Sequence, residues 1–94
     1  MQVPPVRNCE VTDCAYNSGT ACHAWAITIG DGTTPRCDTS FHFKNKGGDP
    51  ETTASIGACK VSGCQFNNKL ECQASEVVVG FKEHEADCLT FKAT

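Results

Sequence analysis

The sequence predicts a small β-rich protein of two tandem, irregular β-hairpin units that is stabilised by metal or by disulfides and has little or no helix. The 94-residue chain holds eight cysteines, and they form two sets of four with nearly the same spacing. Large apolar residues are scarce, with five Phe, one Trp, one Tyr and one Met. Units this short bury too little apolar surface to offset the loss of chain entropy, so cross-links must contribute to stability.

The cysteine spacing divides the chain into two units and a linker. The first set is spaced C-x4-C-x7-C-x14-C, and the second is spaced C-x4-C-x7-C-x15-C. We therefore expect a first unit over residues 6–41, a linker over residues 42–55 and a second unit over residues 56–92. The linker contains Gly-Gly, Asp-Pro and a polar run, which are typical of turns and flexible tethers.

Two arrangements of the units are compatible with this repeat. The first is a pair of separate lobes, which is favoured because the position of Trp25 is occupied by Ser75 in the second copy. The second is one pseudo-twofold domain, in which the units pack through Val6 and Ile56 or through Trp25.

Within each unit the same elements are expected in the same order. A turn at Thr12-Asp13 lets the first two cysteines approach one another, and a second turn covers residues 16–19. β-branched residues predict a strand over Ala24–Ile29, and Gly30-Asp31-Gly32 is a hairpin-turn signal before the return strand. The second unit repeats this order with a turn at Ser62-Gly63, a turn over residues 66–69 and a strand over Ala74–Val79.

The amino-terminal residues 1–7 lack the basic start and the apolar stretch of a secretory signal. We therefore expect a cytoplasmic protein, in which paired cysteines are more often metal ligands than disulfides. A chain from which a signal had already been removed would instead favour a secreted, disulfide-bonded scaffold. The longest apolar runs, Ala24–Ile27 and Val77–Val79, are too short to cross a bilayer.

Four thiolates in each unit are the ligand set of a closed structural Zn²⁺ site that leaves no open position for a substrate. We therefore expect two Zn²⁺ ions, one per unit, although all-thiolate sites also accept iron. The sequence lacks the C-x2-C pair of the usual zinc knuckle, in which backbone N–H groups point at the sulfurs. The expected ligands are Cys9, Cys14, Cys22, Cys37, Cys59, Cys64, Cys72 and Cys88.

Asparagine and histidine are the other candidates near these sites. Asn17 and Asn67 are either ordinary turn residues or residues of left-handed (αL) turns whose amides donate to a thiolate. No histidine occupies the same position in both copies, so we expect His23, His42 and His84 on the solvated surface.

Longer matching segments support a family resemblance. The segments C-E-V-T-D-C-A-Y-N, C-H-A-W-A-I-T-I and C-D-T-S-F correspond to C-K-V-S-G-C-Q-F-N, C-Q-A-S-E-V-V-V and C-L-T-F. This pattern resembles the bacterial four-cysteine family called domain of unknown function fifteen-forty, over nearly the whole chain except the linker and the first few residues. The resemblance implies a small bacterial protein thought to bind metal, and it supplies no biochemical activity. The first copy departs from the pattern because Ser40 is inserted before Phe41.

These observations favour a non-catalytic zinc-binding tandem module that mediates a macromolecular interaction. A metal buffer or metal-responsive thiolate protein and a secreted disulfide scaffold are the alternatives. An enzyme is disfavoured, because no cysteine lies outside the two sets and no acid–base pair is evident.

Charge narrows the class of partner. Two four-thiolate zinc sites would take the formal charge from -3 to about -7, and the basic residues form no stripe. We therefore expect no nucleic-acid partner. We also expect a monomer that does not bind membrane. Trp25 is the candidate exposed aromatic, whereas Tyr16 and Phe66 are expected in the core.

Overall fold

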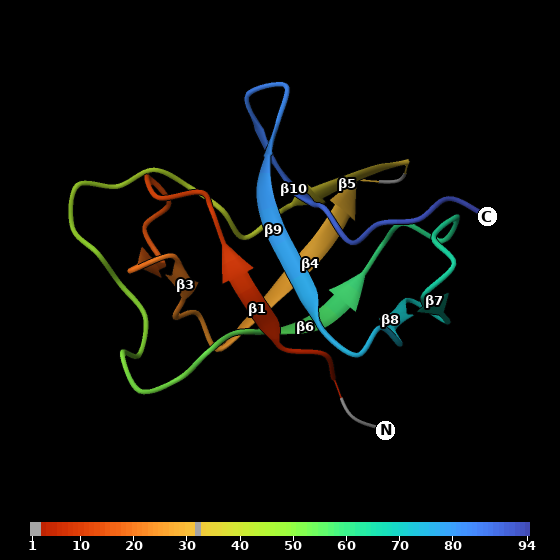
Figure 1. Ribbon diagram of the computed structural model, residues 1–94, viewed down its shortest axis with the longest axis horizontal. Helices are drawn as coiled ribbons and strands as arrows, with labels where there is room; N and C mark the ends of the chain where they lie inside the picture. The colour runs from red at the N-terminus through yellow and green to blue at the C-terminus, as the bar shows by residue number, and fades with distance from the viewer. Residues whose placement is uncertain (1–2, 32) are drawn as a thin grey trace.

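The computed structural model describes residues 3–31 and 33–94, and these residues form β-strands, turns and bends but no helix (Figure 1). The first unit contains β1 (Val6–Cys9), β2 (Asn17–Ser18), β3 (Ala21–Cys22), β4 (Ala26–Asp31) and β5 (Thr34–Cys37). The second unit contains β6 (Ser55–Cys59), β7 (Asn67–Asn68), β8 (Glu71–Cys72), β9 (Val77–Lys82) and β10 (Glu85–Cys88). The predicted β-rich class is confirmed. In this part of the chain no helix is long and apolar enough to cross a membrane.

The strands of the two units interleave in one sheet, whose order is β1-β9-β10-β5-β4-β6. β1 pairs in parallel with β9 of the second unit, and β6 pairs in parallel with β4 of the first unit. β4–β5 and β9–β10 are antiparallel hairpins, and they are joined by the register pair Arg36–Asp87 between β5 and β10. Each unit therefore donates its first strand to the hairpin of the other unit (Figure 1).

The two exchanged strands follow the same register. Val6 lies opposite Val77 in the β1–β9 pair, and Ile56 lies opposite Ile27 in the β6–β4 pair. Each position in one pair is the fifty-residue counterpart of a position in the other. The favoured arrangement of two separate lobes is therefore wrong, and the units form one pseudo-twofold structure.

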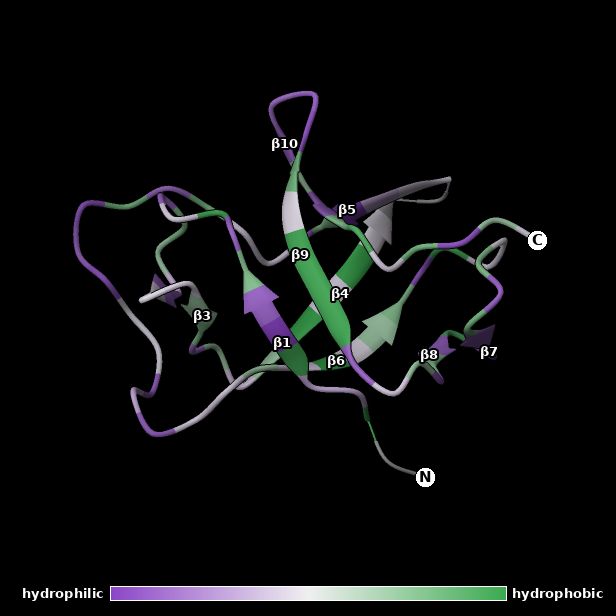
Figure 2. Ribbon diagram, viewed as in Figure 1, coloured by the Kyte–Doolittle hydropathy of each residue, from purple (hydrophilic) through white to green (hydrophobic). Residues whose placement is uncertain are grey.

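The core lies where the two exchanged pairs cross. Val6, Ile27, Ile56 and Val77 are exposed by 0%, 2%, 1% and 1%, and they belong to one hydrophobic cluster. Figure 2 shows the hydrophobic colour concentrated on β4 and β9. Trp25, in contrast, is 77% exposed and does not belong to this cluster.

The long strands begin later than the sequence predicts. β4 begins at Ala26 rather than Ala24, because the N–H of His23 still bonds the Tyr16 carbonyl and extends the β2–β3 hairpin. β9 likewise begins at Val77 rather than Ala74, after the N–H of Gln73 bonds the Phe66 carbonyl.

The predicted turn at residues 30–32 is also displaced. Gly30 and Asp31 belong to β4, and Gly32 lies outside the described residues. Gly30 has a φ of +108°, and a Cβ there would lie 2.7 Å from Val61 Cγ2 of the second unit. Glycine is therefore needed at this position for a close approach between the units, in addition to its backbone conformation.

The linker is attached to the first unit by hydrogen bonds. Lys46 Nζ donates to the carbonyls of Thr12 and Cys14 at 2.8 and 2.9 Å. The N–H of Asp49 donates to the His23 carbonyl, and His23 Nδ1 lies 2.9 Å from the Thr52 carbonyl oxygen. His23 is therefore half-buried rather than fully solvated, whereas His42 and His84 are exposed.

Candidate metal centre

The four thiols of the first unit line one small cavity. β1, β3 and β5 each end on a cysteine, namely Cys9, Cys22 and Cys37, and Cys14 lies in the turn between β1 and β2. All four residues are buried, with exposed fractions of 5 to 7%. The predicted turn after the first cysteine therefore returns the chain so that Cys14 reaches the cavity that Cys9 lines.

The second unit repeats this arrangement around its own cavity, which is lined by Cys59, Cys64, Cys72 and Cys88. Cys59 and Cys64 are buried, whereas Cys72 and Cys88 are half-buried. The structure thus brings all eight predicted residues to two cavities, four to each, and the second set is more accessible to solvent.

Both cavities are small and lined mainly by apolar atoms and sulfur. The space open to the centre of a water molecule is about 10 Å³ in the first unit and about 20 Å³ in the second. That volume is close to what one water-sized species needs. Each cavity therefore suits a single ion and is too small for an organic substrate.

Backbone N–H groups point at two sulfurs of each set. Cys22 receives a hydrogen bond from the backbone of Ala24, and Cys37 receives hydrogen bonds from the backbones of Thr39 and Ser40. In the second unit, Cys72 is bonded in the same way by Ala74, and Cys88 by Thr90 and Phe91. The Cys-x-Ala and Cys-x-Thr segments thus supply the N–H groups that a C-x2-C knuckle would supply.

Burial and N–H donation act in opposite directions on these thiols. Burial raises the pKa of Cys37 to about 11, the backbone N–H groups oppose this increase, and the nearby Cys22 and Cys14 add to it. The pKa of Cys88 is likewise raised to about 11, first by burial. A cation among the sulfurs would favour their thiolate forms, because an opposite charge at close range stabilises the ionised group.

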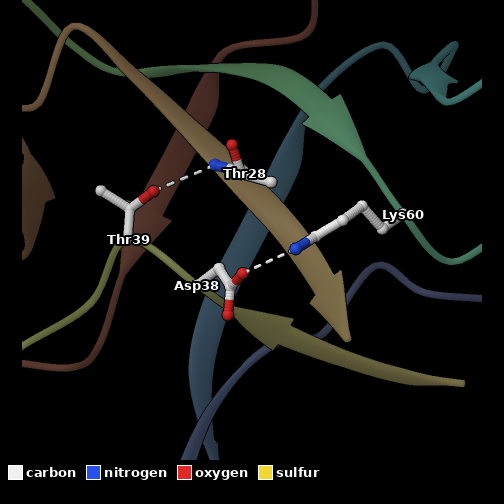
Figure 3. A network of polar contacts seen from close by, with 4 residues as sticks. All are labelled: Thr28, Asp38, Thr39 and Lys60. Carbon is white, nitrogen blue, oxygen red and sulfur yellow. Dashed lines mark hydrogen bonds and ion pairs between the residues drawn. The ribbon is translucent and has the colours of Figure 1, made fainter. Parts of the chain in front are cut away.

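The threonine of each Cys-x-Thr segment fixes the chain after the last cysteine. The N–H of Thr28 in β4 donates to Thr39 Oγ1 at 3.0 Å (Figure 3). In the second unit, the N–H of Val78 in β9 donates to Thr90 Oγ1 at 2.9 Å. These bonds hold the segments whose N–H groups face Cys37 and Cys88.

The two asparagines do not bond to sulfur. Asn17 Nδ2 donates to the Cys9 carbonyl at 2.7 Å, and Asn67 Nδ2 donates to the Cys59 carbonyl at 2.8 Å. Both residues lie in short strands and have no positive φ. The αL-turn hypothesis is therefore wrong, and the asparagines fix the backbone of the first cysteine instead.

The aromatic residues near the cavities differ between the units. Phe91 packs against the core and lines the second cavity, whereas Ser40 occupies the corresponding place in the first. Phe41 is 49% exposed and meets the Tyr16 ring edge-on, with the ring centroids 5.5 Å apart. Tyr16 and Phe66 pack against the core as expected.

The sulfurs share a cavity without forming a complete coordination shell. All eight cysteines are free thiols. Over residues 3–31 and 33–94, no group of three or more His, Cys, Asp or Glu side chains is placed so that it could hold a metal ion. The donor set itself fits zinc, because four soft thiols and N–H donors to sulfur meet in each unit. Binding of one ion by all four sulfurs would therefore require the cysteine side chains, which already line the cavity, to adopt other rotamers.

The fold and the two thiol cavities define a tandem cysteine-rich β module. A family model, the Domain of Unknown Function (DUF1540), matches residues 8–53 and residues 58–91. The chain therefore belongs to this family and contains two copies of its domain. No match was found among curated proteins or among solved structures.

Proposed function

We propose that this protein is a non-catalytic module that binds one Zn²⁺ ion in each unit through four cysteine thiolates. The observation that carries the proposal is the convergence of four thiols on one cavity in both copies. The backbone N–H groups at Cys22, Cys37, Cys72 and Cys88 support it, because such bonds stabilise thiolate ligands.

The metal would act as a cross-link rather than as a reaction centre. Four protein ligands leave zinc no open position, and structural zinc sites supply folding free energy. The short strands of each unit need such a cross-link, because β2, β3, β7 and β8 contain only two residues each. The proposed role is to hold each turn and hairpin against the shared core.

The proposal extends to a macromolecular partner in the cytoplasm. An open groove on the first unit is lined by residues that include Tyr16, Trp25, Thr39 and Pro50. Trp25 is 77% exposed there, and the corresponding residue of the second unit is Ser75. Large aromatic residues are enriched at protein interfaces. The net negative charge favours a protein partner over nucleic acid.

Mass spectrometry tests the metal part of the proposal directly. The full chain, purified without added metal, should retain two metal ions under native conditions and lose both on denaturation. Elemental analysis of the same sample distinguishes zinc from iron. Cys37→Ser and Cys88→Ser should each remove one ion, whereas the exposed substitution Ser18→Ala should remove none. A native mass equal to that of eight free thiols, or short by two hydrogens per disulfide, would contradict the proposal.

Removal of the metal tests whether it is structural. A chelator should abolish the β-sheet circular dichroism signal together with the bound metal, because structural zinc contributes to the folding free energy. A signal that persists after complete metal loss would instead support the metal-buffer alternative.

A further inference from the structure

Two ion pairs cross the boundary between the units. Arg7 on β1 contacts Glu76 of the second unit, with Nε and Oε2 2.6 Å apart. Lys60 of the second unit contacts Asp38 of the first, with Nζ and Oδ2 2.9 Å apart (Figure 3). Both pairs therefore join the exchanged first strand of one unit, or the residue after it, to the body of the other unit.

The pseudo-twofold counterpart of each ion pair carries different chemistry. The counterparts of Arg7 and Glu76 are Gly57 and Ala26. These two residues are also neighbours, because a Cβ at Gly57 would lie 3.3 Å from the Cβ of Ala26. The ion pair is thus present on one side of the pseudo-twofold axis and absent on the other.

The same holds for Lys60 and Asp38, whose counterparts are Glu10 and Leu89 after the one-residue difference in spacing. Glu10 and Leu89 also lie together, because both would contact a Cβ placed at Gly80, at 2.8 and 2.7 Å. At the pseudo-twofold equivalent of the Lys60–Asp38 ion pair, an acidic side chain (Glu10) therefore lies beside an apolar one (Leu89).

The register pair that joins the two hairpins consists of residues with opposite formal charge. Arg36 and Asp87 are counterparts of one another, and they are the register pair that joins β5 to β10. Asp87 is 4% exposed, and its Oδ1 atom has no hydrogen-bond partner. A second carboxylate at the opposing position would place two acids across one strand pair, where like charges are destabilising.

Pairing of identical units would replace each favourable contact by an unfavourable or neutral one. Two first units would place Glu10 beside Asp38 on both sides and Arg36 opposite another Arg36. Two second units would place Asp87 opposite Asp87. Only the unlike pair combines opposite charges at the axis with ion pairs at the boundary.

Each thiol cavity also depends on the other unit. Val79 of the second unit lines the first cavity, and Ile29 and Pro35 of the first unit line the second cavity. A single unit would therefore lack a wall of its own cavity as well as one strand of its sheet.

We propose that this boundary is a strand-exchange interface that selects the unlike unit as its partner. The hairpin of each unit accepts, along one edge, the first strand of the complementary unit of the same chain. The charges of residues 36 and 87, with the two ion pairs, disfavour the like pairs relative to the unlike pair. The proposal depends on strand pairing and is independent of the metal proposed above.

Cleavage of the folded chain tests the interface. A protease site is inserted between Lys44 and Asn45, which are exposed and lie in the linker. After cleavage, the two fragments should elute together at the mass of the intact protein and give one unlike species in native mass spectrometry. Elution as two separate fragments would overturn the proposal.

Selectivity is measured by denaturing the cleaved protein and refolding it at a constant zinc concentration. Native mass spectrometry separates the three pairs, because the two fragments differ in mass. Unlike pairs should exceed either like pair by about tenfold, whereas pairing without selection would make them only about half of the total. A mixture in which unlike pairs make up only about half of the total would overturn the proposed role of the charges.

Charge reversal separates selectivity from folding. Asp87→Arg and Arg36→Asp should each reduce the excess of unlike pairs several-fold, and the double substitution should restore it. Lys69→Glu on the β7–β8 turn is the matched control and should leave the ratio unchanged. If both single variants kept the parent ratio of unlike to like pairs, or if the double variant did not recover it, the charges of residues 36 and 87 would not be the source of selectivity.

Discussion

Replacement of Ile56 by Ala tests whether both units unfold as one body. Ile56 is 1% exposed and lies opposite Ile27 of the first unit at the centre of the shared core. The substitution removes three buried carbon atoms, and at about 0.8 kcal/mol per CH₂ their transfer alone costs about 2.4 kcal/mol. The cavity that remains adds to this, so the free energy of unfolding should fall by about 3 kcal/mol.

A loss of that size is a large fraction of the roughly 5–15 kcal/mol that stabilises a typical domain. It should lower the melting temperature by about 15 °C for a chain of this length. Thermal unfolding followed by circular dichroism, at a fixed Zn²⁺ concentration, measures this shift. Val3→Ala is the control, because Val3 is 48% exposed and its loss should change stability by less than about 0.5 kcal/mol.

Hydrogen exchange distinguishes a shared core from two independent ones. In the Ile56→Ala variant, amides of β4 in the first unit should lose protection together with those of β6 and β9. Protection of β4 at the parent level, while only the second unit exchanges faster, would refute the shared core.

Three further predictions concern the thiols, a surface carboxylate and the exposed tryptophan. In the reduced, metal-free protein, iodoacetamide should modify the half-buried Cys72 and Cys88 before their buried counterparts Cys22 and Cys37, as peptide mapping would show. The pKa of Asp38 should lie below its ordinary value because of the hydrogen bond and charge of Lys60, so this contact stabilises the fold at neutral pH and is lost as the pH falls through the lowered pKa. In an NMR titration, Lys60→Ala should return the pKa of Asp38 toward its ordinary value, and no change would contradict the assignment. Trp25→Ser should change the free energy of unfolding by less than about 0.5 kcal/mol, and a larger loss in denaturant titration would indicate a structural role.

The cysteine repeat predicted which thiols lie together in each unit. Spacing alone assigned four thiols to each unit, and the structure places the same four around each cavity. The N–H groups that face the sulfurs could also have been inferred, because both copies contain Cys-x-Ala and Cys-x-Thr. These segments donate backbone N–H groups to the sulfurs, which is the role of the C-x2-C pair in a zinc knuckle.

The exchange of strands could not be read from the repeat. Val6 and Ile56 are equivalent and apolar, so either strand satisfies the pairing pattern of either hairpin. The contacts that join an exchanged strand to its partner, such as Arg7–Glu76, connect residues far apart in the sequence, and the repeat spacing does not reveal them. For the same reason, the linker composition suggested a free tether, although Lys46 binds two carbonyls of the first unit.

The strand exchange also couples the two candidate sites. Cys9 ends β1 and lies opposite Val79, which lines the cavity that Cys9 lines. Cys59 ends β6 and lies opposite Ile29, which lines the second cavity in the same way. A metal held by Cys9 would therefore fix β1 against β9 and thereby order the hairpin that carries Cys88. Because the same contacts act in the reverse direction, occupancy of either site should favour the folded form of the other.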